Sequence, residues 1–95
     1  MTFEKSVLLT MQAALLGAVS PNLRMVLVSI APDGVQMDCL FDGDPSEDDV
    51  ESMSCVETEL IASLPPDVIV LTNIERFDFP KPLPKRLYPV YQRRE

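Results

Sequence analysis

The sequence predicts an α+β fold for residues 1–95, a single domain in which two helices cover one face of a four-stranded, mostly antiparallel sheet. Two segments repeat apolar residues at three- and four-residue steps, which is typical of helices. Four shorter segments are rich in β-branched residues or alternate apolar and polar residues, which is typical of strands. Turn-forming residues separate these segments, and the resulting order is α-β-β-α-β-β.

Residues 3–19 are expected to form the first helix. One apolar stripe consists of Phe3, Val7, Met11, Ala14 and Ala18. A second stripe on the far side consists of Leu9, Ala13 and Leu16. We expect both sides to pack within the protein, with a partner or homodimer contact through the second stripe as the alternative. The segment lacks the net positive charge of a signal peptide, and we interpret it as part of the mature protein.

Residues 24–30 and 35–42 are expected to form a β-hairpin around the turn at 32–34. The second strand alternates cleanly. One face carries Val35, Met37, Cys39 and Phe41, and the other carries Gln36, Asp38, Leu40 and Asp42. The first of these faces is expected to lie on the core and the second in water.

The second helix is expected at residues 46–64. Ser46 and Asp49 have the spacing of a capping box, and the prolines at 65 and 66 end the helix. Residues 67–72 then predict a strand that 75–79 can continue. Residues 87–93 predict a final strand, which Pro89 places at an edge because proline cannot donate a ladder hydrogen bond.

The composition argues against several classes of function. The chain has no histidine and only three glycines, so it lacks the usual base of a nucleophilic triad and a glycine-rich phosphate loop. The net charge of −7 disfavours nucleic acid as a ligand, and no apolar run approaches the ~20 residues that span a membrane. We therefore expect no enzyme activity, with a small carboxylate hydrolase as a weaker alternative, and no cofactor.

Metal binding and disulfide bonding are not expected. Acidic and hydroxyl residues alternate from 42 to 48 as in a calcium loop, but Glu47 and Met53 stand where that loop needs glycine and glutamate. Cys39 and Cys55 have no CxxC spacing, and we expect no export signal. Both cysteines are therefore predicted to be reduced thiols of a cytoplasmic protein.

Acidic residues gather in the middle of the chain and basic residues in its tail. Residues 33–59 hold ten acids and no base, and the stretch DGDPSEDDVE at 42–51 holds six of those acids. A capped helix and a solvated loop explain part of this cluster, and the tail bases can neutralise some of it. The alternative is a surface that binds a basic protein. Its predicted contacts are Asp38, Asp42, Asp44, Glu47, Asp48 and Glu51.

Glu57 falls among apolar residues on the wheel of the second helix. Its neighbours on that face are Val50, Met53, Leu60, Ile61 and Leu64. Because a buried carboxylate needs a partner, we expect a structural ion pair or hydrogen bonds that hold the helix to the sheet, with Arg24 or Arg76 as the partner of Glu57. The alternative is a recessed acid that receives a base from a partner protein.

Four segments carry a resemblance to a known group: LLGAVSPNLRMV, DGDPSEDDVE, VETELIASLP and VYQRRE. Together they resemble small bacterial immunity proteins of toxin–immunity systems, including contact-dependent growth inhibition. The resemblance implies a cytosolic inhibitor that binds one cognate toxin, often a nuclease with a basic groove. We therefore expect a non-enzymatic immunity protein, with a self-associating adaptor that uses the Leu9 stripe as the alternative.

Overall fold

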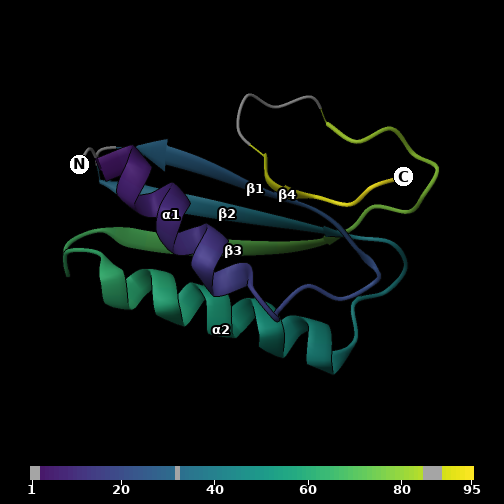
Figure 1. Ribbon diagram of the computed structural model, residues 1–95, viewed down its shortest axis with the longest axis horizontal. Coiled ribbons are helices and arrows are strands. Elements are labelled where there is room, and N and C mark those ends of the chain that lie inside the picture. Colours follow the sequence, from purple (N-terminus) through teal and green to yellow (C-terminus); the bar gives the residue numbers. More distant parts are fainter. Residues whose placement is uncertain (1–2, 32, 85–88) are drawn as a thin grey trace.

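The computed structural model describes residues 3–31, 33–84 and 89–95 (Figure 1). The order α-β-β-α-β-β and the α+β class are confirmed. The helices are α1 (Phe3–Leu15) and α2 (Glu47–Ser63). The strands are β1 (Leu23–Ala31), β2 (Gly34–Phe41), β3 (Ile69–Arg76) and β4 (Pro89–Gln92).

The four strands form one mixed sheet in the order β3-β2-β1-β4. β1 pairs antiparallel with both β2 and β4, whereas β2 and β3 are parallel. A parallel pair needs a crossover connection, and α2 provides it between β2 and β3. β3 and β4 are therefore the two edges of the sheet.

The bounds of β1, β2 and α2 lie within one residue of the prediction, whereas those of α1 and β3 differ from it by more. α1 ends at Leu15 rather than at residue 19, because the chain turns through Gly17, whose φ of +79° favours glycine. β3 runs without a break from Ile69 to Arg76. β4 is described from Pro89, and the first two residues of the predicted last strand lie outside the described residues.

Both helices pack on the same face of the sheet and share one core with it. The side chains that β2 contributes are those predicted from its alternation, namely Val35, Met37, Cys39 and Phe41. The helices contribute chiefly Val7 and Met11 from α1, and Met53, Val56 and Leu60 from α2. Val50 and Ile61, which were predicted to lie on the buried face of α2, are exposed instead.

The face of the sheet away from the helices carries a smaller apolar cluster. Met25, Leu27 and Leu40 are buried there, and Phe77 and Leu83 from the connection between β3 and β4 pack against them. This connection therefore covers part of the open face. Within the described residues, neither helix is long and apolar enough to cross a bilayer.

Candidate functional site

The acidic segment begins with a helix cap that uses Asp49. The Oγ of Ser46 accepts a hydrogen bond from the backbone N of Asp49 at 3.1 Å, and Asp49 Oδ2 accepts one from the backbone N of Ser46 at 2.9 Å. Asn22 Nδ2 also donates to Asp49 Oδ2, at 2.7 Å. Burial acts to raise the pKa of Asp49, but the hydrogen bonds from Ser46, Asn22 and Ser20 outweigh it and lower this pKa. The predicted capping box is confirmed, and Asp49 stabilises the N-terminus of α2.

Two further acids of the segment are neutralised by bases from later in the chain. Arg93 Nη2 lies 3.3 Å from Asp42 Oδ2, and Arg76 Nη1 lies 3.0 Å from Asp44 Oδ1. Arg76 also pairs with Asp78, and hydrogen bonds to Asp78 and Asp44 raise the pKa of Arg76. Asp42 and Asp44 are therefore weaker candidates for partner contacts than their charge alone indicated.

The other three acids of the segment at 42–51, Glu47, Asp48 and Glu51, lie on the solvent side of α2. The helix carries six acids and no base between Glu47 and Ser63. At 100° per residue, four of its exposed acids fall on an arc opposite the buried residues Met53, Val56 and Leu60. We define this arc, made of Glu47, Asp48, Glu51 and Glu59, as the acidic face of α2.

Asp38 does not lie on the same surface as these acids. The alternation of β2 places Asp38 on the open face of the sheet, opposite the face that the helices cover. There it accepts hydrogen bonds from Gln36 Nε2 at 3.1 Å and from Asn73 Nδ2 at 3.4 Å. The idea that all six predicted acids share one surface is wrong for this residue, because the sheet separates it from α2.

Glu57 is half-buried between α2 and the sheet, where it accepts a hydrogen bond from the hydroxyl of Thr72 on β3. The predicted ion pair with Arg24 or Arg76 is wrong, since Arg24 pairs with Glu95 and Arg76 pairs with Asp44 and Asp78. Glu57 lies over the parallel pair of β2 and β3. Its partner is therefore the polar side chain that β3 turns toward the helix.

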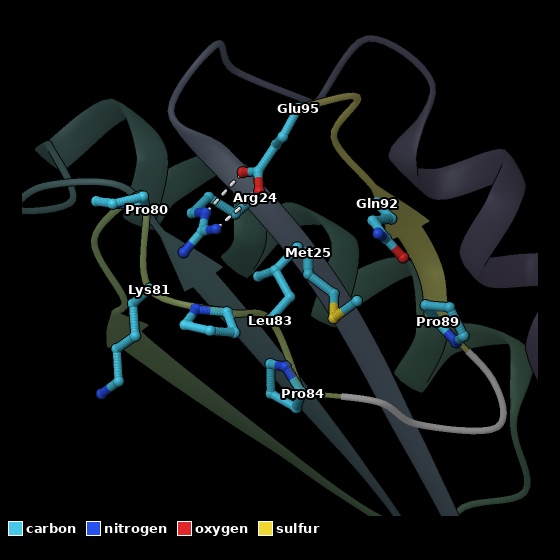
Figure 2. Close-up of a pocket in the computed structure, with 10 residues that line it drawn as sticks. Arg24, Met25, Pro80, Lys81, Leu83, Pro84, Pro89, Gln92 and Glu95 are labelled. Carbon is cyan, nitrogen blue, oxygen red and sulfur yellow. Dashed lines mark hydrogen bonds and ion pairs between the residues drawn. The ribbon is translucent and has the colours of Figure 1, made fainter.

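Arg24 forms a charged cluster at one end of β1 (Figure 2). Its side chain is only 1% exposed. Its Nε and Nη2 donate to the two carboxylate oxygens of Glu95, each at 2.7 Å, and its Nη1 donates to the carbonyl of Phe77 at 2.8 Å. The guanidinium also lies 5.8 Å and 5.6 Å from the ring centroids of Phe77 and Phe79.

These hydrogen bonds change the acidity of Glu95. Donation by Arg24, with a further contribution from Arg93, lowers the pKa of Glu95 to about 2. A hollow of about 450 Å³ lies beside the pair, and half of its lining comes from residues 80–84 of the segment after β3 (Figure 2). Sequence reasoning missed this cluster because the two partners are 71 residues apart, and no local spacing links them.

The two cysteines are free thiols in different environments. Burial, followed by the negative charges of Asp38 and Glu57, raises the pKa of Cys39 to about 12, so this thiol is a poor nucleophile. Cys55 is exposed on α2.

Across residues 3–31, 33–84 and 89–95, no group of three or more potential ligands is arranged to hold a metal ion.

The second stripe of α1 is exposed rather than packed. Leu9 is 52% exposed and Leu16 is 82% exposed, and Ala13 between them also faces solvent. The expectation that both sides of the helix are buried is therefore wrong. α1 buries only the stripe that faces the sheet and α2.

The fold and its charges define a small α+β protein with an acidic helix on its surface and its buried charges committed to structural contacts. The chain belongs to the MafI2 immunity protein family, whose family model matches residues 4–95. The resemblance to immunity proteins is thereby confirmed. A search of the curated proteins found no match.

Proposed function

We propose that this chain is a non-enzymatic immunity protein that binds and neutralises one cognate toxin domain through the acidic face of α2. Membership of the MafI2 immunity protein family supports the role. The observation that carries the choice of surface is that α2 has six acids and no base, and points four of the exposed acids away from the core.

The physical basis of the proposal is electrostatic attraction. A cluster of carboxylates on one side of a helix attracts a basic protein over a distance of about 10 Å at ordinary ionic strength and raises the association rate. A nuclease-type toxin has a basic groove for phosphates, and carboxylates on a rigid helix can occupy such a groove. The toxin of this proposal is therefore a basic domain, and the encounter takes place in the cytoplasm.

Three of the proposed contacts are among the acids predicted from the sequence, and Glu59 is added because of its place on α2. Glu47, Asp48 and Glu51 are exposed on the acidic face in the first turns of α2. Glu59 is exposed on the same face nearer the end of the helix. Asp42 and Asp44 contribute less because Arg93 and Arg76 offset their charge. Asp38 contacts the same toxin only if the interface extends around the edge of the sheet.

Growth rescue tests the proposed function. The toxin domain encoded next to this chain is expressed in a host with and without the chain, and any complex is then recovered by affinity purification. We expect the chain to restore growth and to co-purify with the toxin in a complex that weakens as salt is raised. A toxin that kills equally in the presence of the folded chain would contradict the immunity role.

Self-association through the exposed stripe of α1 is a second candidate function. The exposure of Leu9 and Leu16 favours it, because large apolar side chains at helical spacing suit contact with another helix. Sedimentation of the purified chain distinguishes the two. A stable dimer that Leu16→Glu converts to monomer would support the adaptor, and a monomeric wild type would count against it.

A further inference from the structure

The two edges of the sheet differ in how well they are protected from pairing. β4 is four residues long, begins with a proline and shifts register against β1, and these features all hinder the addition of another strand. β3 is eight residues long, contains no proline, and pairs with β2 in unbroken register. Within the part of the chain that the structure describes, the outer edge of β3 pairs with no strand.

The direction of the backbone groups on β3 follows from two hydrogen bonds at its ends. The N–H of Ile69 donates to the carbonyl of Asp33 at 3.1 Å, and the N–H of Phe77 donates to the carbonyl of Phe41 at 2.6 Å. Both donors are odd-numbered and face the β2 side. Because successive residues of a strand point their N–H groups to opposite sides, the N–H groups of Val70, Thr72 and Ile74 point to the free edge.

The side chains along this edge combine apolar surface with negative charge. Ile69 and Leu71 are 62% and 59% exposed on the open face of the sheet. Asn73 follows them on that face and donates to Glu75 Oε1 at 2.6 Å. The nearest base along the strand, Arg76, is already paired with Asp44 and Asp78.

We infer that the free edge of β3 accepts an extended strand of the toxin, in which apolar side chains cover Ile69 and Leu71 and basic side chains meet Glu75 and Asp38. This inference rests on the proposed function and names the part of the surface that the toxin pairs with. Backbone hydrogen bonds of an added strand supply affinity, and alternate side chains supply specificity. A strand of opposite charge is the best match to an acidic edge.

A second copy of this chain fits the edge less well than a basic partner. Each copy carries a net charge of −7, so edge-to-edge pairing would bring two acidic surfaces together. The edge also lies beside α2 (Figure 1), and the hydrogen bond between Thr72 and Glu57 joins the strand to that helix. One toxin domain can therefore contact the acidic face of α2 and the edge of β3 at the same time.

The matched pair Thr72→Pro and Thr72→Val tests the added strand. Both variants lose the hydroxyl that binds Glu57, but only proline removes the N–H that points to the free edge. An edge strand tolerates proline at such a position, so the ladder with β2 is retained. Affinity for the toxin domain encoded next to this chain is measured by calorimetry. We expect Thr72→Pro to bind about 30-fold more weakly than Thr72→Val, because one partner carbonyl is left unpaired.

Hydrogen exchange of the wild-type chain provides a measurement that does not depend on a variant folding. On addition of the toxin domain, the amides of Val70, Thr72 and Ile74 are expected to become protected. A side-chain test uses Leu71→Lys against Leu9→Lys, which makes the same change at a residue of similar exposure on α1. Only Leu71→Lys is expected to weaken binding.

The outcomes separate this inference from the proposed function. If the wild type binds the toxin while the three amides exchange freely and Thr72→Pro binds like Thr72→Val, the edge pairing is wrong and the immunity role stands. If the wild type does not bind the toxin at all, the proposed function fails as well. If the same amides are protected in the chain alone as its concentration rises, the occupant is a second copy and the inference is overturned.

Discussion

The carboxylate of Glu95 accepts two hydrogen bonds of 2.7 Å from the buried guanidinium of Arg24. Arg24 is the second residue of β1, and it also donates a hydrogen bond to the carbonyl of Phe77 just beyond β3. One side chain therefore joins β1, the segment after β3 and the segment after β4. A buried arginine is stabilising only while its donors are satisfied, so this end of the sheet depends on the pair.

We expect the free energy of unfolding to decrease as the pH is lowered, partly because Glu95 becomes protonated. Its pKa is about 2 in the folded protein against an ordinary value of 4.5. A lowered folded-state pKa contributes stability that is present above the unfolded-state pKa and is lost as the pH falls toward the folded-state value. The pair therefore stabilises the fold fully above about pH 5 and loses this contribution between about pH 5 and 2.

Glu95→Gln tests this pH dependence. We expect the variant to have a lower free energy of unfolding at neutral pH and a shallower decline over the acidic range than the wild type. Urea denaturation at a series of pH values measures both. Glu59→Gln removes one exposed carboxylate from α2 and is the control. Parallel pH profiles for Glu95→Gln and the wild type would show that the pair does not contribute.

Arg24→Lys is expected to destabilise the protein although it keeps the charge. A lysine ammonium cannot bridge both oxygens of Glu95 and the carbonyl of Phe77 in the planar geometry of a guanidinium. We expect a loss of about 2 kcal/mol in the free energy of unfolding, measured by urea denaturation. Arg94→Lys, at an exposed position, should change it by less than about 0.5 kcal/mol. An equally small effect of Arg24→Lys would show that the guanidinium hydrogen bonds to Glu95 and Phe77 do not stabilise the fold.

The orientation of α2 predicts opposite outcomes for two adjacent residues. Leu60 is fully buried and Ile61 is exposed. Leu60→Ala should cost about 2–5 kcal/mol of unfolding free energy because it leaves a cavity against the sheet. Ile61→Ala should cost less than about 0.5 kcal/mol. Thermal or chemical denaturation distinguishes them, and a large cost for Ile61→Ala would indicate a buried contact on the acidic side of the helix.

Local patterns in the sequence were sufficient for most of the fold. The core face of β2 and the capping box at Ser46 and Asp49 each depend on neighbouring residues, and both are confirmed. The expectation that the other face of β2 lies in water is wrong at Leu40, which is buried. The helical wheel of α2 was less accurate, since Val50 and Ile61 are exposed. A wheel gives the direction of an apolar stripe but not how far the sheet extends on either side of it.

The charged contacts could be predicted only in part. That bases of the tail offset acids of the middle followed from charge counting, and Asp42 with Arg93 and Asp44 with Arg76 are instances of it. The individual partners did not follow. Arg24 meets Glu95 because β4 pairs with β1, a long-range neighbour relation that no spacing in the sequence encodes.

The most direct test of the acidic-face proposal is the association rate of the chain with its toxin domain at low and high salt. Glu51→Lys on the acidic face is compared with Glu4→Lys, which makes the same charge change at an exposed position of α1. We predict that Glu51→Lys slows association about 3–10-fold at low salt and that the difference shrinks as salt is added, while Glu4→Lys has little effect. Equal association rates for the two variants at low salt would contradict binding through the acidic face of α2.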